Sequence, residues 1–306
     1  MFVSVIIPTY NGAHKLPSVL QAIARQSKKP DEIIVVIDGS TDDTRQVLEA
    51  EKTNIPNLRW IYQENRGRAV VRNTGAHAAK GDLLVFFDDD MLPSVDCLAV
   101  HIDHHTTYSN SILTGAQIDY LDDRRTDIQK FKAFLSKKWS EPLRQMEGKP
   151  LCREQVFITA ANFSIPKDLF LQLGGFDDQL TDAEDFDLAI KAYRAKIALY
   201  YNHKAFAWHN DLVTGIGYIK RLRQYNKAHQ FLKEFKPDMY KDVPQFNQLI
   251  QPGKKQLAFL FFANRFWVRW LDKNGIKMIL PKDLRYKMYD WIITANGVYF
   301  PEKVAL

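Results

Sequence analysis

The run Val85–Met91, VFFDDDM, places three carboxylates directly after a hydrophobic segment. Neighbouring like charges repel one another and aspartate is depleted in strands, so the fold itself gains little from this arrangement. The run therefore predicts a strand whose end presents acids to a cation or to a reaction. An acidic surface turn is the alternative interpretation.

Four short apolar runs alternate with helical patterns over the first part of the chain. In order, the runs and the helical patterns are 3–7 (VSVII), Lys15–Gln26, 33–37 (IIVVI), Thr41–Glu51, 58–62 (LRWIY), Arg68–Ala79 and 83–87 (LLVFF). Runs that are apolar almost throughout are typical of strands covered on both faces. The alternation predicts right-handed crossovers and an α/β fold with a mainly parallel sheet. Ser40 or Thr41 is the expected N-cap of the second helix.

The alternation loosens after Met91. The expected strands are 112–118, 156–160, 197–201 and 205–208, and the expected helices are 127–138, a short one within 169–176 that ends at glycines, and 183–194. From about Leu212 the chain is basic and aromatic, with helical periods and no clear strand pattern.

The composition allows a full core and a mildly basic surface. Of the 306 residues 46% are hydrophobic, the formal net charge is +6 and the sequence pI is about 9.1, which suits a phosphate-bearing ligand or an anionic membrane surface. The two cysteines form no CxxC pair, which disfavours a disulfide framework or a zinc cluster and indicates a reducing compartment. The start, MFVSVIIPTYNG, lacks the features of a signal peptide, and no window holds 18 uninterrupted apolar residues. The expected address is the cytoplasm.

Polar signatures follow three of the predicted strands. They are Pro8-Thr9-Tyr10-Asn11-Gly12, Asp38-Gly39-Ser40 and Asp88-Asp89-Asp90. Turn chemistry explains the first or the second taken singly, but parallel strands bring all three to the edge where such sheets bind ligands. A tyrosine stacks on a base, an aspartate accepts from a pyrimidine N–H, and carboxylates hold Mg²⁺ or Mn²⁺. With no GxxxxGK[ST] or GxGxxG loop after the first strand, this set predicts a nucleotide-diphosphate site.

Four motifs resemble, in order, those of the GT-A fold family 2 glycosyltransferases. They are VSVIIPTYNGAHKL, IIVVIDGSTDDT, ENRGRAVVRNTGAHAAKGDLLVFFDDD and GGFDDQLTDAEDFDLAIKAYR, which span roughly residues 3–210. The resemblance implies a GT-A fold and a metal-dependent, inverting, hexosyltransferase-type enzyme. It further implies a nucleotide-diphosphate sugar donor, most simply a UDP-sugar, with Mn²⁺ or Mg²⁺ as cofactor and a glycan or lipid-linked acceptor.

The resemblance also assigns residues to the nucleotide and the metal. Asp38 matches the family's uracil-contacting aspartate, although Ile37 stands where many relatives carry an acid. Arg72 resembles the family's nucleotide-contacting arginine, and Asp90 the metal-coordinating acid of the DxD motif. The nucleotide residues expected in this way are Pro8, Thr9, Tyr10, Asn11, Asp38, Arg72, Asp88 and Asp89, and the expected metal ligands are Asp88, Asp90 and His209, with a structural role as the alternative for His209. Arg66 and Arg68 are either solvated or in contact with the ligand.

In the second half of the motif region, Asp185 matches the general base of inverting members, which takes the proton of the acceptor hydroxyl. Its neighbour Glu184 has two interpretations, because Thr181-x-x-Glu184 matches a capping box. The candidates for contact with the sugar or the acceptor are Asn162, Gly175, Phe176 and Glu184, with a satisfied loop amide as the alternative for Asn162. His101, His104 and His105 lack the partners of a zinc site and are expected to bind no metal.

We therefore expect a catalytic domain over 1–211, with a nucleotide half at about 1–91 and an acceptor half at about 92–211, and a helical extension over 212–306. The extension is either a cap on the catalytic domain or a surface that lies in a membrane interface, where its tryptophans and basic residues would fit. The catalytic half contains no clustered basic motif with interleaved aromatic residues, so nucleic acid is not an expected ligand. The rival functions are a non-catalytic nucleotide-sugar-binding protein and a sugar nucleotidyltransferase.

Overall fold

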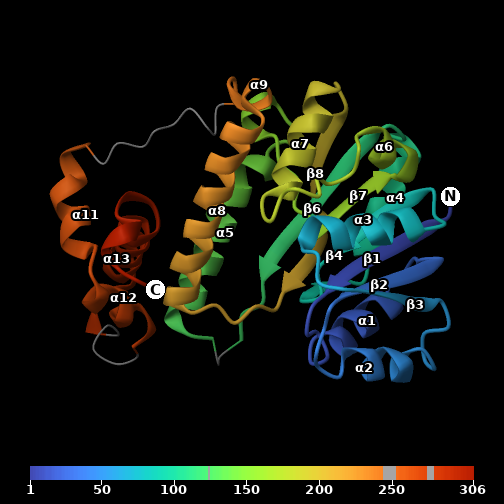
Figure 1. Cartoon of the computed structure of the whole chain (residues 1–306), viewed down its shortest axis with the longest axis horizontal. Coiled ribbons are helices and arrows are strands. Elements are labelled where there is room, and N and C mark those ends of the chain that lie inside the picture. The colour runs from blue at the N-terminus through green and yellow to red at the C-terminus, as the bar shows by residue number, and fades with distance from the viewer. Residues whose placement is uncertain (123–124, 244–252, 274–278) are drawn as a thin grey trace. The chain divides into compact units, whose positions relative to one another are not determined.

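The computed structural model of the chain describes residues 1–122, 125–243, 253–273 and 279–306 (Figure 1). They form two compact units, of which unit 1 comprises Met1–Tyr120 and Trp139–Asn210, and unit 2 comprises Leu121–Lys138 and Asp211–Leu306. The expected division after residue 211 lies one residue from the second unit boundary. Residues 121–138, which the sequence placed in the catalytic domain, belong to unit 2, because Ile128 and Phe131 pack into its helical core.

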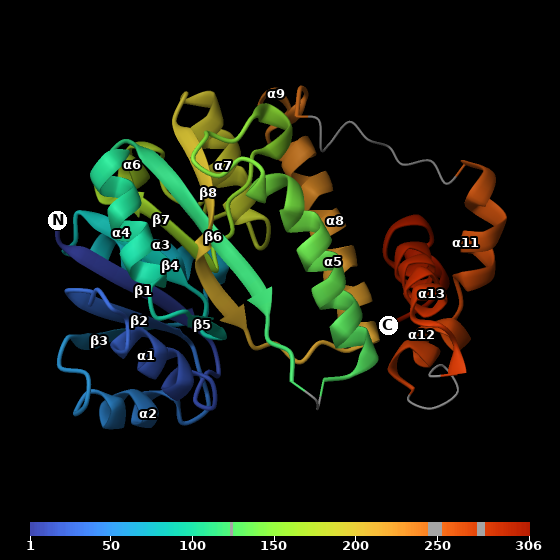
Figure 2. The same cartoon turned by 180° about the vertical axis from the view of Figure 1, so that it is seen from behind.

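The described part of unit 1 holds one sheet of eight strands with helices on both faces (Figures 1 and 2). The strands are β1 Val3–Thr9, β2 Glu32–Asp38, β3 Leu58–Gln63, β4 Leu83–Phe87, β5 Met91–Pro93, β6 Ser111–Asp119, β7 Asn162–Pro166 and β8 Ala198–His209. The helices are α1 Leu16–Ala24, α2 Thr44–Glu51, α3 Arg68–Ala78, α4 Cys97–Thr107, α6 Lys167–Gln172 and α7 Glu184–Arg194, and α5 Asp127–Arg144 begins in unit 2 and ends in unit 1. A short 3-10 turn spans Arg153–Gln155.

The strand order is β3-β2-β1-β4-β7-β6-β8-β5. The first four strands of the chain pair in parallel, as predicted, whereas β7 runs antiparallel to both β4 and β6, and β5 antiparallel to β8. The sheet is therefore mixed, and its parallel half brings the carboxyl ends of β1, β2 and β4 to one edge.

The two faces of the parallel half have separate partners. Alternate residues of each strand point to opposite faces, and Val5, Val35 and Val85 share one apolar cluster with residues of α1, α2 and α4. On the other face Phe86 packs against Phe170 of α6 and Phe176, with 5.6 and 5.8 Å between ring centroids. Both faces are thus covered, which explains why these strands read as continuous apolar runs.

Two strand predictions after Met91 were wrong. Residues 156–160 form no strand, because the backbone N–H of Asn162 donates to the carbonyl of Thr159 in a turn and the strand β7 starts only at Asn162. The apolar run that begins at Val156 continues to Ile165, so its composition does not show at which residue the strand begins. The segments 197–201 and 205–208 form one strand, β8, which carries an irregularity where its pairing with β6 shifts between Gly115 and Ala116.

The predicted helix caps also differ from the structure. The N-cap of α2 is Asp43 and not Ser40 or Thr41, and it makes no side-chain cap bond. Instead, Ser40 accepts a hydrogen bond from the backbone of Asn11. The side chain is therefore used to join two loops of the sheet edge.

The described part of unit 2 is helical, as expected. Its elements are α8 Gly215–Phe235, α9 Pro237–Tyr240, α11 Gln256–Phe262, α12 Arg265–Asp272, α13 Lys282–Thr294, a π-helical turn Ala295–Tyr299 and 3-10 turns at Gly253–Lys255 and Pro301–Lys303. The start of α5 joins this core through Asp127, whose carboxylate receives two hydrogen bonds from Arg285 and one from Tyr289. Within the described residues no helix is long and apolar enough to span a bilayer.

A histidine network lies buried between α4 and β7. His101 contacts the hydroxyl of Ser164 at 2.8 Å through Nδ1 and the amide oxygen of Asn162 at 2.9 Å through Nε2, and His105 contacts the same hydroxyl at 2.8 Å. Burial lowers the pKa of His101 to about 4 and that of His105 to about 3. These imidazoles are therefore neutral, hydrogen-bonded parts of the core.

We predict that the protein loses stability as the pH falls from about 6.5 to 4. The unfolded chain protonates its imidazoles at about 6.5, whereas the folded chain keeps His101 and His105 neutral, so each contributes a loss of about 1.4 kcal/mol per pH unit. Urea denaturation at a series of pH values measures the slope. Burial also lowers the pKa of the adjacent His104 to about 4, so His105→Gln is expected to remove about a third of the histidine contribution, and an unchanged slope in that variant would contradict the assignment.

Candidate active site

The polar ends of β1 and β4 meet at the edge of the sheet, as the sequence predicts. The hydroxyl of Thr9 donates to Asp89 at 2.7 Å, and Lys15 Nζ lies 3.0 Å from the other oxygen of Asp89 and 3.7 Å from Asp90. Gly12 is required between them, since a Cβ there would lie 2.0 Å from the Thr9 hydroxyl and 2.9 Å from Asp89. The acidic run is thus held by β1 and the loop before α1.

Asp38 organises the loop between β3 and α3. Its carboxylate accepts hydrogen bonds from the Gln63 side chain at 2.7 Å and from the backbone N–H groups of Arg66 and Gly67 at 2.9 and 3.0 Å. The side chain is 5% exposed. The uracil contact expected of Asp38 stays a prediction, and it would use the acceptor capacity that these three bonds leave.

The other residues expected at the nucleotide lie on the loop after β1. Asn11 adopts a left-handed backbone with φ of 51°, and its side chain accepts from the backbone of Thr41 at 2.8 Å. Tyr10 is 53% exposed, so its ring is available for stacking. Pro8 lies in β1, next to Thr9. A hydrogen bond between a side chain and the backbone therefore already joins the loops after β1 and β2 in the absence of a ligand.

Arg72 of α3 joins the acidic run to the start of α7. Its guanidinium is buried, and it donates to Asp88 at 2.5 Å and to Glu184 at 2.6 Å. Its Nε is also buried and has no hydrogen-bond partner among the described residues. Burial alone would raise the pKa of Asp88, but the Arg72 guanidinium outweighs it and holds that pKa below its ordinary value.

This bridge corrects the capping-box interpretation of Glu184. The N-cap of α7 is Ala183, which has no side-chain cap bond, and the Glu184 carboxylate turns to Arg72 instead. The expected contact of Arg72 with the nucleotide stays a prediction. In the structure its donors serve the two carboxylates.

Asp90 and His209 lie together at the expected metal position. His209 Nε2 is 3.6 Å from Asp90, and its Nδ1 is 3.9 Å from Asp119, a residue not singled out from the sequence. The pKa of Asp90 is raised by burial and by the charges of Asp88 and Asp89, although His209 and Lys15 act in the opposite sense. A carboxylate and an imidazole beside an excess of negative charge suit a divalent cation.

The described residues do not contain a preformed cluster of three or more metal-ligating side chains. Asp88 is engaged by Arg72, while Asp90 and His209 are the pair placed to ligate. The residues present thus fit a metal ion that completes its coordination with oxygen atoms of a bound phosphate ligand, as Mg²⁺ commonly does.

Asp185 lies in the first turn of α7, next to the Arg72–Glu184 pair. Its carboxylate accepts from the backbone N–H groups of Ala160 at 3.2 Å and Phe186 at 2.8 Å, which fixes its orientation. Burial and the neighbouring charge of Glu184 raise its pKa to about 6. A half-buried carboxylate with that pKa is suited to accept a proton near neutral pH.

Three residues expected to contact the sugar or the acceptor have structural roles instead, and they are Asn162, Phe176 and Gly175. Asn162 is fully buried, and its amide donates to the carbonyls of Ala116 and Ala205 and accepts from His101, so it leaves nothing for a sugar. Phe176 is 1% exposed and packs among the core phenylalanines.

The glycine loop before Phe176 is held against α3 by Asn73. The Asn73 amide donates to the Phe176 carbonyl at 2.8 Å and accepts from its N–H at 3.0 Å. Gly175 has φ of 62°, and a Cβ there would lie 2.8 Å from the Asn73 oxygen. The loop therefore fixes the approach to α7 and does not present side chains to a sugar.

Lys15, Asn73 and Asp119 were missed by sequence reasoning. Asn73 and Lys15 lie inside motifs that were recognised, but a polar residue in a helical pattern carries no signal of its contacts across more than 70 residues. Asp119 ends β6, so a strand-end acid was the signal that could have found it.

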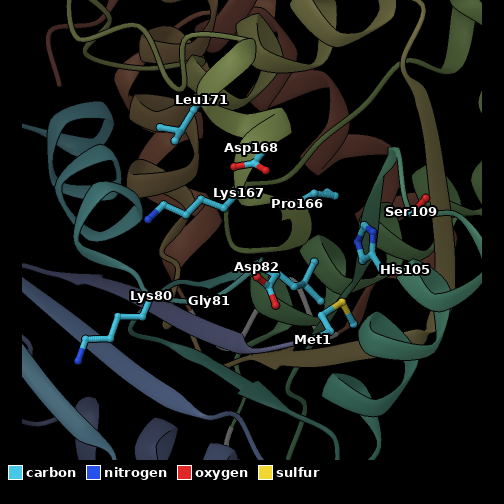
Figure 3. Close-up of a pocket in the computed structure, with 11 residues that line it drawn as sticks. Met1, Lys80, Gly81, Asp82, His105, Ser109, Pro166, Lys167, Asp168 and Leu171 are labelled. Atoms are coloured by element: carbon cyan, nitrogen blue, oxygen red, sulfur yellow. The ribbon is translucent and has the colours of Figure 1, made fainter.

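A hollow of about 600 Å³ lies elsewhere in unit 1 (Figure 3). Its lining includes Met1, Leu83 and Pro166, which mark the amino end of β4 and the sheet edge opposite the acidic run. Ligands of parallel sheets bind at carboxyl ends, so this hollow is not the predicted site.

Comparison with known sequences gives a consistent set of matches. A sequence model of the family described as "Glycosyl transferase family 2" matches residues 4–174. The uncharacterised glycosyltransferase RT0329 of Rickettsia typhi is 26% identical over 319 residues, covering 95% of this chain and 96% of that protein. The uncharacterised glycosyltransferase YfnE of Bacillus subtilis is 38% identical over 116 residues, which covers 38% of this chain and only 30% of YfnE.

Solved structures share the fold. The mannosyltransferase PcManGT from Pyrobaculum calidifontis, in complex with GDP-Man and Mn²⁺, has a TM-score of 0.63 and 20% identity, covering 98% of this chain and 88% of that one. TarS 1–349 of S. aureus in complex with UDP has a TM-score of 0.54 and 18% identity, covering 98% and 92%. The expected GT-A fold is confirmed.

We predict that Arg72→Met destabilises the protein by about 3–5 kcal/mol, because it leaves the Glu184 carboxylate buried without its cation. Urea denaturation measures the change. The matched control is Arg45→Met, whose ion pair with Glu49 is exposed and is expected to matter by at most about 0.5 kcal/mol. The double variant R72M/E184L should recover most of the loss, and a loss below about 1 kcal/mol in R72M would contradict the proposed bridge.

Proposed function

The chain belongs to glycosyltransferase family 2, and we propose that it moves a sugar, with inversion, from a UDP-sugar to a hydroxyl group of a glycan or lipid-linked acceptor, with Mn²⁺ or Mg²⁺ bound. Family membership makes the chain a glycosyltransferase with a nucleotide-sugar donor. The nucleotide, the metal, the stereochemistry and the acceptor are the parts that we propose. The rival nucleotidyltransferase is thereby set aside.

The observation that supports the mechanism is the position of Asp185. Arg72 joins Asp88 to Glu184 through two short contacts, so the acidic run and the start of α7 lie within one side chain of each other. The carboxylate next in sequence, Asp185, is held by two backbone N–H groups and makes no ion pair within the described parts of the chain. A base beside a diphosphate-binding edge is the arrangement that a direct displacement requires.

In the proposed step Asp185 takes the proton of the acceptor hydroxyl as its oxygen attacks the anomeric carbon and the bond from that carbon to the diphosphate breaks. Burial and the charge of Glu184 raise the pKa of this base to about 6, so it is ionised at neutral pH and still basic enough to act. Asp90 and His209 would hold the metal, which when bound neutralises the departing diphosphate. A single carboxylate in this role supports inversion.

UDP is the proposed nucleotide because the Asp38-Gly39-Ser40 motif resembles that of UDP-sugar enzymes in the family. The neighbours differ on this point, since TarS was solved with UDP and PcManGT with GDP-Man. Asp38 is an acceptor, and both uracil and guanine offer a ring N–H. The donor must therefore be tested with both nucleotide series.

We propose the acceptor from the family resemblance, and the location of the enzyme from the composition of the chain. A cytoplasmic address agrees with two cysteines that are both free in the structure. A lipid-linked acceptor would bring the enzyme to the inner face of a membrane.

We predict that Asp185→Asn lowers kcat by about 10²–10⁴, because the amide cannot accept the acceptor's proton. The dissociation constant for the nucleotide should change little, since Asp185 bonds only backbone groups. Both quantities are measured with purified protein, by release of the nucleoside diphosphate and by calorimetry.

The control for this variant is Glu184→Gln, which keeps the base and its burial but removes the neighbouring charge that also raises its pKa. Wild-type kcat/KM should fall below a pH of about 6, and in E184Q this acid limb should move to lower pH. Near-wild-type turnover in D185N, or an acid limb that E184Q leaves in place, would remove Asp185 from the mechanism.

We predict that Mn²⁺ is needed for stabilisation by UDP-sugars. At a ligand concentration of 100 times Kd, binding adds about 2.7 kcal/mol to the stability of the fold, which raises the melting temperature. The measurement is thermal unfolding with a panel of UDP- and GDP-sugars, each with Mn²⁺ or with a chelator. Asp90→Asn should abolish the metal-dependent part.

Slow hydrolysis of the stabilising donor, followed in the same panel, separates an enzyme from a non-catalytic binder. Stabilisation by GDP-sugars alone would contradict the proposed nucleotide. Full stabilisation in the presence of the chelator would contradict the proposed metal.

A further inference from the structure

An exposed apolar surface lies on α11 and α12 of unit 2, and the proposed reaction makes no use of it. We call it the α11–α12 surface, and its members are Leu257, Leu260, Phe261, Phe266 and Trp267. Leu257 is 80% exposed, Phe261 61% and Phe266 66%. Large apolar side chains exposed together in this way mark an interaction site on most proteins.

The members of this surface are contiguous. The ring of Trp267 lies 5.5 Å from that of Phe261 and 5.1 Å from that of Phe266, measured between centroids. Asn264 joins the two helices, because its side chain accepts from the backbone of Phe266 and Trp267 and caps α12. The surface is therefore set by the fold and not by loose side chains.

The opposite sides of the same helices supply the core of unit 2. Phe259 and Phe262 of α11 and Val268 and Leu271 of α12 are buried in the helical cluster. Each helix is thus apolar on its packed side and again on its solvent side. The exposed phenylalanines do not add to the core, so another surface is the simplest explanation for them.

The charge around the surface is positive. Arg265 and Arg269 are exposed on α12, and neither is ion-paired with a carboxylate in the part of the chain that the structure describes. Residues 243–271 contain no aspartate or glutamate. The next acid, Asp272, is engaged at the amino end of α8, where it accepts from Gly215 at 2.6 Å and from Ile216 at 3.3 Å.

We propose that the α11–α12 surface docks on an anionic lipid bilayer, with Phe261 and Phe266 inserted at the boundary between headgroups and acyl chains and Arg265 and Arg269 on lipid phosphates. Aromatic side chains flanked by arginines suit this boundary, which is apolar on one side and negatively charged on the other. The arginines supply the charge complementarity that selects an anionic bilayer over a neutral apolar partner.

This inference goes beyond the proposed function and does not depend on it, because vesicle binding is measured without donor or acceptor. A protein that binds vesicles but transfers no sugar would leave the inference standing. A protein that transfers sugar to a soluble acceptor but binds no vesicles would overturn the inference alone.

The test is co-sedimentation of the full chain with vesicles of phosphatidylglycerol or of phosphatidylcholine at low salt. Binding to phosphatidylglycerol is expected, with a blue shift of tryptophan fluorescence as Trp267 leaves water. Phosphatidylcholine should bind at least tenfold more weakly. No sedimentation with phosphatidylglycerol at low salt would overturn the proposal.

Variants separate the two parts of the surface. F261S/F266S should bind all vesicles at least tenfold more weakly, whereas R265Q/R269Q should lose roughly 25-fold on phosphatidylglycerol, at about fivefold per arginine, and little on phosphatidylcholine. The matched control is Tyr62→Ser in unit 1, since Tyr62 is 62% exposed but has Glu64 nearby in sequence, and it should bind as the wild type does.

The fold of each variant is checked by circular dichroism and thermal unfolding. Wild-type vesicle binding by folded F261S/F266S would overturn the assignment of the surface. Sedimentation velocity tests the other occupant, a second copy of the chain. A dimer that F261S/F266S dissociates, in a protein that ignores vesicles, would assign the surface to self-association and overturn the proposal.

Discussion

The bridge from Arg72 to Asp88 and Glu184 is the interaction on which the geometry of the site depends. Arg72 and Glu184 are each about 5% exposed at the side chain, so neither charge is tolerated there without the other. The pair joins α3, which follows β3, to α7, which follows the glycine loop more than 100 residues later. The helix α7, which carries the proposed base Asp185, is therefore placed against the acidic strand end by electrostatics as well as by apolar packing.

Each aspartate of the acidic run after β4 has its own basic partner. Asp88 contacts Arg72 at 2.5 Å, Asp89 contacts Lys15 at 3.0 Å, and Asp90 has His209 at 3.6 Å. The first two partners carry full positive charges in short contacts, whereas the third contact is longer and its imidazole is charged only when protonated. Burial raises the pKa of Asp90, the charges of Asp88 and Asp89 add to this effect, and His209 and Lys15, 3.7 Å away, oppose it, so a divalent cation there would relieve repulsion.

The sequence could predict what depends on local pattern and chain order. Apolar runs such as Ile33–Ile37 identify strands covered on both faces, and their order places the strand ends, with Asp38 and Asp88, at one edge. It could not predict which polar groups face inward. Asn162 reads like a loop amide near a sugar, yet its two carbonyl partners lie on β6 and β8, strands whose register no local pattern gives. The predicted sugar contact of Phe176 is wrong for the same reason, because the rings that bury it come from distant segments of the chain.

The start of α7 shows how the bridge compensates a local conflict. The sequence Thr181-x-x-Glu184 favours a capping box, but the N-cap is Ala183 in a left-handed backbone with φ of 59°, which costs about 1–2 kcal/mol for a residue with a Cβ. A capping box would draw the Glu184 carboxylate back to its own helix and leave Arg72 buried with one partner fewer. The ion pair is the stronger contact, so the helix begins at a strained residue. The strain is confined to Ala183, the residue directly before Glu184 and the proposed base Asp185, so it lies where the proposed mechanism needs a fixed orientation.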